Sequence, residues 1–270
     1  MEVMMSYLNK SQEYFISKLL KKYSYDIVLE IIEDAEIEDD NLYLLLKSCQ
    51  HAVNFDFRSS IKYVNDMDDS MNNRKEIKQL TSNLQSLIEG DPDNILSELI
   101  ENTKIQIVNG EYIDFLGRLY RLQEALFKYI FVSTKEKKNY KIGMHGNMMS
   151  KKNILYTLKK KYNIYNGNLI HGVTHYVNKY VKQTKRMEKV MSILNSQRLE
   201  NLIKLRNISP VGHGFKGVSK EEIENIYGNP MEVINDLVKV CELLDLEIVM
   251  NKYDNINEMI IQMIGKYIES

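Results

Sequence analysis

An arginine and a histidine lie close together in the last third of the chain, in the segment KLRNISPVGHGF. Six residues separate Arg206 from His213, and Asn207 directly follows the arginine. A histidine transfers protons near neutral pH and, when well placed, accelerates a reaction by about 10²–10⁴-fold. An arginine holds a phosphate with a fork of donors and stabilises negative charge as it develops. These residue types therefore suit proton transfer and anion binding at one site.

The elements around this segment are predicted to hold the two side chains in place. A helix from about Thr184 should end at Arg206, because the next eleven residues, NISPVGHGFKG, are rich in helix breakers. Ser209 in that stretch is expected to shape a loop. Ser219 with Glu222 three residues later is typical of a capping box that begins the next helix. The sequence thus predicts a helix, a tight loop and a second helix.

The histidine is predicted to lie within that loop, where its backbone is accessible. Gly212 and Gly214 flank His213, and we expect them to let a phosphate backbone approach closely. The structural alternatives remain open. A lone loop histidine is more often a hydrogen-bonding residue than a catalyst, and Arg206 could merely cap the C-terminus of its helix, where a cation is favourable.

An all-α fold is predicted from the rarity of residues that interrupt helices. The 270 residues include only three prolines and twelve glycines, whereas a sandwich or barrel needs a turn about every 8–12 residues. Apolar residues at helical spacing within 111–132 predict a central core helix. We expect a helical bundle with additional hairpins and about ten helices. Residues 133–168 are predicted to form a long loop, and residues 247–250 a short strand.

A domain boundary is predicted near Asp91 and Pro92, which follow a helix that ends at Gly90. Residues 1–91 are then expected to form an N-terminal region of helical hairpins. Residues 92–270 would form the second helical domain, which holds the arginine and the histidine. One continuous domain is the alternative.

Positive charge is concentrated in the middle of a nearly neutral chain. Residues 128–189 contain fifteen Lys or Arg and two acidic residues, a net charge of +13, although the whole chain carries −1. A positive region of this kind fits a polyanionic partner. A solvated lysine-rich surface is the alternative.

Composition favours a protein of the cytoplasm. Cys49 and Cys241 are far apart and outside any CxxC pattern, which excludes a disulfide framework and a cysteine-rich zinc site. The first residues lack the pattern of a signal peptide. No apolar run approaches the roughly 18 residues of a membrane span, so no membrane partner is expected.

The motif resembles the active site of HEPN ribonucleases, in which four to six residues separate an arginine from a histidine. RNISPVGHGF (206–215) looks like the HEPN half of the CARF–HEPN ribonucleases associated with type III CRISPR systems. So do KKYSYDIVLEII (21–32), HAVNFDFRSSIKYV (51–64) and YIDFLGRLYRLQEALFKY (112–129). The similarity covers nearly the whole chain. The chain departs from these relatives in having no α/β region like the CARF sensor.

The resemblance implies a bundle of HEPN type and a metal-independent endoribonuclease that cuts single-stranded RNA in antiviral defence. It assigns Arg206, His213 and Asn207 to the catalytic site, without cofactor or metal. It also implies a homodimer in which both protomers supply residues to one composite site. Because the CARF region is missing, a separate sensor or activator protein is a further expected partner.

Four alternative interpretations stay open. A degenerate HEPN-like module could bind nucleic acid or a protein partner without cutting, and a purely structural helical scaffold is also possible. His171 and His175 have the spacing of two metal ligands on one helix face, but two ordinary histidines are favoured because no third ligand is evident. Arg118 and Arg121 could reach RNA, although pairing with Glu124 or Glu111 is favoured.

Overall fold

The computed structural model describes residues 8–135 and 150–268, and it confirms the predicted all-α fold. Within these ranges every regular element is helical, apart from one isolated bridge between Leu8 and Ile268. The expected count of about ten helices is a little low. No described helix has both the length and the apolar character to cross a membrane.

The chain divides into two compact units. One contains the residues up to Ile88 together with those from Asn251 onward, and the other extends from Glu89 to Met250. The predicted boundary near Asp91 lies beside the first of these transitions. The return of the chain to the first unit at Asn251 was not expected, because the domains predicted from the sequence placed residues 92–270 in one domain. Residues 251–268 belong to the first unit because their apolar stripe packs on the N-terminal helices.

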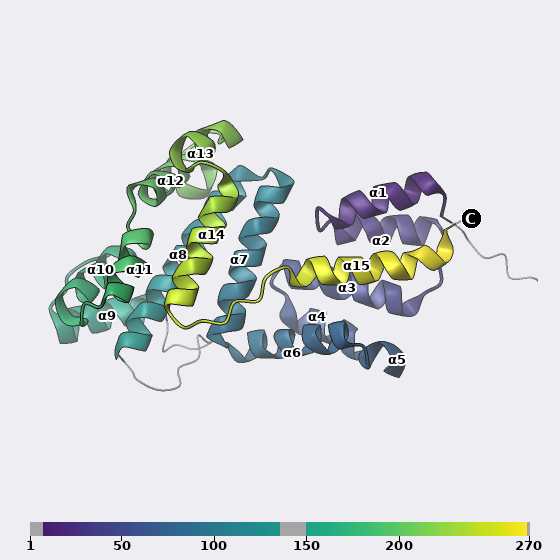
Figure 1. The fold of residues 1–270 in the computed structure, drawn as a ribbon, viewed down its shortest axis with the longest axis horizontal. Coiled ribbons are helices and arrows are strands. Elements are labelled where there is room, and N and C mark those ends of the chain that lie inside the picture. Colours follow the sequence, from purple (N-terminus) through teal and green to yellow (C-terminus); the bar gives the residue numbers. More distant parts are fainter. Residues whose placement is uncertain (1–7, 136–149, 269–270) are drawn as a thin grey trace, which may run out of the picture. The chain divides into compact units, whose positions relative to one another are not determined.

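The first unit consists of helical hairpins closed by the last helix of the chain (Figure 1). Its elements are α1 (Lys10–Leu20), α2 (Tyr25–Asp34), α3 (Asp40–Val53), α4 (Phe57–Asn65), α5 (Asp69–Asn72), α6 (Lys75–Glu89), α15 (Lys252–Ile264) and η3 (Gly265–Tyr267). Buried Asn257 of α15 fixes this closure. Its side chain accepts a hydrogen bond of 2.9 Å from the Tyr25 hydroxyl and donates one of 2.8 Å to the Leu20 carbonyl.

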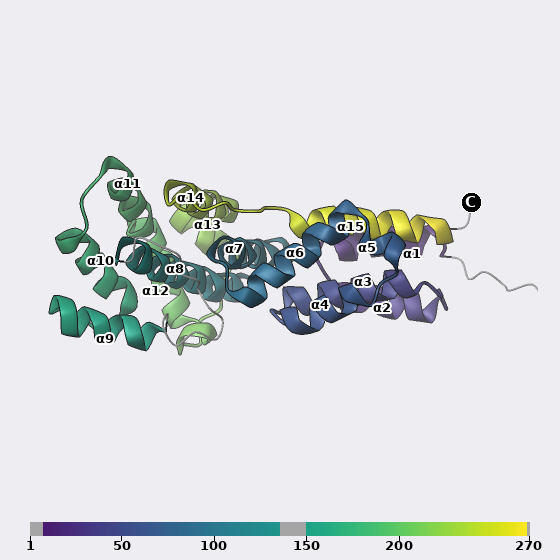
Figure 2. The same cartoon turned by 90° about the horizontal axis from the view of Figure 1, so that it is seen from below.

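The second unit is built around one long helix, α8 (Tyr112–Lys135). The other elements are α7 (Pro92–Asn109), α9 (Lys151–Tyr162), α10 (Leu169–Tyr180), α11 (Lys185–Leu194), α12 (Gln197–Ile208), η2 (Pro210–Gly212), α13 (Lys220–Tyr227) and α14 (Pro230–Leu243). Helix α8 packs against α7, α9, α10, α12 and η2, and Figure 2 shows it with α7 on one side and α10 on the other.

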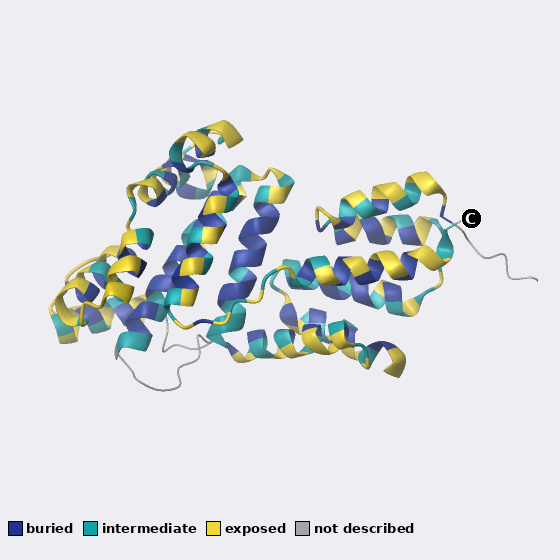
Figure 3. Ribbon diagram, viewed as in Figure 1, coloured by how far each residue is buried: buried dark blue, intermediate teal, exposed yellow. Residues whose placement is uncertain are grey.

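The prediction of a central core helix is confirmed. Phe115, Leu119, Leu122 and Leu126 of α8 are fully buried, and so is Ile130 one turn later. In Figure 3 buried residues extend over most of α7 and along one side of α8. The apolar stripe of α8 thus supplies the surface on which the helices of this unit assemble.

Three local predictions need correction. The helix expected from Thr184 to Arg206 is two helices, α11 and α12, because Ser196 caps a new helix with its hydroxyl on the Leu199 amide (3.3 Å). The loop expected over 133–168 contains the end of α8 and all of α9, which begins at a Ser150 cap. Residues 136–149 lie outside the described ranges. Residues 247–250 form no strand, since they pair with no neighbouring strand in the described chain.

Replacing Asn257 by alanine should destabilise the first unit by about 2 kcal/mol, because it takes the acceptor from the buried Tyr25 hydroxyl and removes one of the two hydrogen bonds to the Leu20 carbonyl. Urea unfolding followed by circular dichroism measures the change. The matched control is Asn255→Ala on the exposed side of the same helix, which should shift the unfolding free energy by less than about 0.5 kcal/mol. Equal effects of the two variants would contradict this account of the closure.

Candidate active site

The last turn of α12 carries the predicted arginine. Leu199, Leu202 and Leu205 of this helix are buried in the core of the second unit, which fixes the rotation of the helix. Arg206 is then half-buried, and Asn207 is exposed. The structure therefore places both predicted site residues at the end of a firmly packed helix.

Ser209 turns the chain directly after α12, and this confirms its predicted role in shaping the loop. Its side chain is buried, and its hydroxyl donates to the Arg206 carbonyl at 2.8 Å. Its own carbonyl accepts hydrogen bonds from the Gly212 amide at 2.8 Å and the Gly214 amide at 3.1 Å. The Lys216 amide then donates to the Ile208 carbonyl at 3.0 Å. The loop is thus tied by its backbone to the end of the helix.

The two glycines allow this close approach, and no other residue type would fit. A Cβ at position 212 would lie 2.2 Å from the Arg206 carbonyl oxygen, and one at position 214 would lie 1.9 Å from the Ile208 carbonyl oxygen. Such distances are far inside van der Waals contact. The expectation that these glycines make room for a phosphate backbone is therefore corrected: they make room for the protein's own helix end.

His213 occupies a strained backbone position between the two glycines. Its φ is 95° and its ψ is 2°, in the left-handed region that non-glycine residues seldom adopt. The side chain is exposed. Residues held in this region cost of order 1–3 kcal/mol and cluster at functional sites, where the surrounding structure imposes the conformation. Here the hydrogen bonds of Ser209 to both neighbouring amides impose it.

A tyrosine of α8 positions the arginine. The Arg206 guanidinium carbon lies 4.7 Å from the centre of the Tyr120 ring, which is a cation–π contact. One terminal nitrogen donates to the Asn207 side-chain oxygen at 3.2 Å. The Nε atom is buried and has no partner among the described residues. Arg206 is therefore oriented by Tyr120 and Asn207, with donor capacity left for an anion.

Helix α8 also holds the loop that carries the histidine. Val211 packs over Gly117, where a Cβ would meet the Val211 side chain at 3.7 Å. Gly117 and Tyr120 are one turn apart on the same face of α8. One helix thus supports the arginine and the histidine loop together. Sequence reasoning missed Tyr120, because nothing local links a tyrosine of α8 to an arginine of α12.

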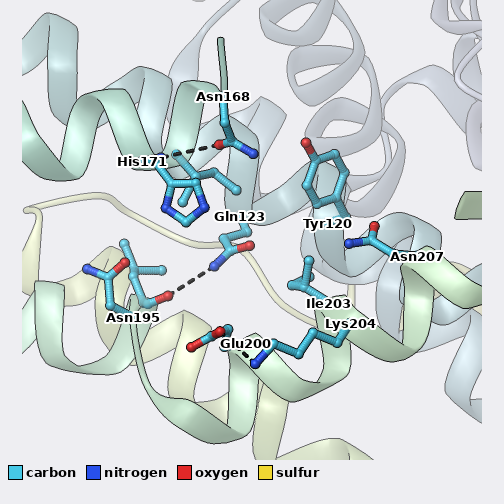
Figure 4. Close-up of a pocket in the computed structure, with 11 residues that line it drawn as sticks. Tyr120, Gln123, Asn168, His171, Asn195, Glu200, Ile203, Lys204 and Asn207 are labelled. Atoms are coloured by element: carbon cyan, nitrogen blue, oxygen red, sulfur yellow. Dashed lines mark hydrogen bonds and ion pairs between the residues drawn. The ribbon is translucent and has the colours of Figure 1, made fainter. Parts of the chain in front are cut away.

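A pocket opens next to this arginine (Figure 4). It has a volume of about 310 Å³, and its walls come from α8, α10, α11 and α12. Tyr120 and Asn207, which both contact Arg206, are among the lining residues, as are Gln123 and His171. His171 is exposed, and the described residues contain no group of three side chains suited to hold a metal ion.

The charges around the pocket are mostly paired or solvated. Lys204 donates to Glu200 at 2.8 Å, and this hydrogen bond lowers the pKa of the Glu200 carboxyl group below its usual value. Arg121 pairs with Glu124 at 3.0 Å, which confirms the structural pairing favoured from sequence. The lysines of α9 are exposed, consistent with either a polyanion-binding or a solvated surface.

Comparison with known protein families identifies a match to this chain. The model described as the Cas_Csm6 HEPN domain matches residues 84–261, about two thirds of the chain. The matched range includes Arg206, Asn207 and His213, and it confirms the family resemblance drawn from their motif. No curated protein matches the chain.

Gly214→Ala should force the loop away from the end of α12, because its Cβ would collide with the Ile208 carbonyl. We expect the protein to lose more than about 1 kcal/mol of stability, as overpacked sites do. Gly217→Ala in the same loop is the matched control, since a Cβ there meets nothing within 4 Å. Thermal unfolding of both variants checks this, and an unchanged melting temperature for Gly214→Ala would show that the close approach is wrong.

Proposed function

Because this chain belongs to the CRISPR-associated Cas_Csm6 HEPN domain family, we propose that it is a metal-independent endoribonuclease that cuts single-stranded RNA in antiviral defence. Arg206 and His213 are the proposed catalytic residues, and Asn207 assists by holding the arginine. The observation that carries the proposal is the shared support of the two side chains by α8 and the end of α12. An RNA substrate also fits an enzyme of the cytoplasm.

The proposed reaction uses the RNA's own 2′-hydroxyl as the nucleophile. The 2′-oxygen attacks the adjacent phosphorus and loses its proton, a bond forms between them, and the bond from phosphorus to the 5′-oxygen breaks. The leaving 5′-oxygen takes up a proton. The products end in a 2′,3′-cyclic phosphate and a 5′-hydroxyl. The chain then has to supply only proton transfer and charge stabilisation, so the reaction requires no metal.

His213 is the proposed group for proton transfer. Its exposed ring lies on a loop whose backbone is fixed by hydrogen bonds, and this limits the positions the ring can take. A fixed donor or acceptor needs less reorganisation when the reaction occurs. The strained φ of His213 supports the same role, because an unconstrained loop would relax it.

Arg206 is the proposed phosphate-binding group. Its guanidinium lies against Tyr120 and is held at one end by Asn207, which leaves the other N–H groups of its terminal nitrogens to the non-bridging oxygens of the phosphate. A planar fork of this kind binds phosphate in a defined orientation, which a lysine ammonium does not. Asn207 contributes by fixing the plane of the fork.

A homodimer with a composite site is part of the proposal. Phe215 is 97% exposed and Ile208 is 49% exposed, and both flank the histidine loop. A large apolar side chain that is nearly fully exposed beside a site is favourably covered by a partner. A second copy would cover it and bring its own arginine and histidine to the same phosphate. The exposed lysines of α9 would extend the surface for RNA. A separate sensor or activator protein stays a prediction.

Cleavage of a fluorescent single-stranded RNA in EDTA tests the activity. Wild type should cut, and His213→Ala and Arg206→Ala should each lower the rate at least about 100-fold. His175→Ala, an exposed histidine of α10 outside the pocket, is the matched control and should cut at the wild-type rate. Equal rates for wild type and His213→Ala would refute the assignment. Binding of RNA without any cleavage would favour the non-catalytic module.

Phe215→Glu tests the dimer, because a charge at this position cannot be buried cheaply against a second copy. Sedimentation should shift from dimer to monomer, with a parallel loss of cleavage. Tyr165→Glu is the control, since Tyr165 is also a strongly exposed aromatic residue, 73% accessible, but lies away from the motif on the loop after α9. A wild-type protein that sediments as a monomer while it cuts RNA would contradict the composite site.

A further inference from the structure

The pocket beside Arg206 contains one buried polar atom that the described chain leaves without a partner. Gln123 of α8 is only 4% exposed, and it lines the pocket. Its amide nitrogen donates to the Leu194 carbonyl at 3.0 Å, while its oxygen has no partner among the described residues. Buried polar atoms without partners are rare, so this oxygen calls for an explanation.

The orientation of the Gln123 amide is determined by its neighbour. The Leu194 carbonyl can only accept, so the NH₂ group of Gln123 must face it. The side-chain oxygen is therefore directed elsewhere, into the pocket, where Figure 4 draws it between Tyr120 and Asn195. This gives the pocket a fixed acceptor at its buried end.

A buried acceptor selects the chemistry of the occupant. An anion such as a phosphate would be repelled by the Gln123 oxygen, whereas a group that carries an N–H donor would satisfy it. The Tyr120 ring and Ile203 add apolar walls, and the side chains of Asn168 and Asn195 add polar edges. Lys204 and Glu200, which line the pocket, are paired with each other. These features fit a flat, neutral heterocycle with an amino group.

The position of the pocket connects it to the proposed reaction. Tyr120 and Asn207 line the pocket and also contact the Arg206 guanidinium. A nucleotide whose phosphate is held by Arg206 would therefore have its base beside the pocket mouth. Proteins read single-stranded RNA in this way, by placing unstacked bases against aromatic side chains and hydrogen-bonding their edges.

We propose that this pocket binds a base of the substrate RNA next to the cleaved phosphate, and that Gln123 selects bases with an exocyclic amino group over uracil. The proposal rests on the proposed ribonuclease function. The amino group of adenine, cytosine or guanine projects from the ring and can reach the recessed Gln123 oxygen. Uracil carries oxygens at both projecting positions, and its N–H lies between them. A uracil would thus bring an acceptor against an acceptor.

Binding of RNA that cannot be cut tests the pocket separately from the catalysis. The probes are fluorescein-labelled hexamers of adenosine, cytidine or uridine with 2′-O-methyl groups, which block the proposed nucleophile. Fluorescence anisotropy with the full chain should give affinities for the adenosine and cytidine hexamers at least about tenfold above that for uridine. Gln123→Met should reduce this preference to less than about twofold, because it removes the acceptor.

Two further variants test whether a change in base preference comes from the pocket. Gln197→Met makes the same change at an exposed position of α12 outside the pocket, and it should retain the preference. Asn195→Trp fills the pocket from its exposed rim without removing the hydrogen bond to Leu194, so it should abolish the preference even if Gln123→Met fails to fold.

Equal affinities of wild type for the three hexamers, absence of binding, or a preference that survives in folded Gln123→Met or in Asn195→Trp would each overturn the pocket proposal. Cleavage of unmodified adenosine and uridine tracts is scored in parallel. A protein that binds with this preference but never cuts contradicts the proposed activity and leaves the pocket intact. A protein that cuts both tracts equally and binds the hexamers equally contradicts only the pocket.

Discussion

The approach of the histidine loop to the end of α12 is the constraint on which the candidate site depends. Ser209 joins the two segments through its hydroxyl and its carbonyl, and Gly212 and Gly214 leave no room between them for a Cβ. His213 is held in a left-handed conformation as a result. The loop backbone that carries the histidine is therefore fixed by hydrogen bonds, and a fixed position suits the proton transfer proposed for His213.

Helix α8 connects this constraint to the rest of the second unit. Its apolar stripe forms the core, while Gly117 and Tyr120 on another face support the loop and the arginine. Gln123, one turn beyond Tyr120, is directed into the neighbouring pocket. The core packing, the proposed catalytic site and the proposed base pocket thus depend on one helix. A change in the packing of α8 would alter all three.

The sequence predicted the structural features that depend on interactions between residues close together in the chain. The rarity of helix-breaking residues and the helical spacing of apolar residues predicted the all-α fold. Ser219 begins its helix with the expected capping box. The short motif predicted the last turn and loop around Arg206 for the same reason. Tyr120 and Gln123 could not be found, because their partners lie on other helices and no pattern encodes a tertiary contact. The return of α15 to the first unit is equally non-local.

In the proposed reaction the RNA's own 2′-hydroxyl is the nucleophile, and Arg206 and His213 assist it. The most direct measurement is mass spectrometry of the ends produced when the wild-type protein cuts a defined single-stranded RNA in EDTA. We expect a 2′,3′-cyclic phosphate on one fragment and a 5′-hydroxyl on the other, and no cut at a linkage preceded by a 2′-deoxynucleotide. Fragments with a 3′-hydroxyl and a 5′-phosphate would contradict it, because those ends require attack by water.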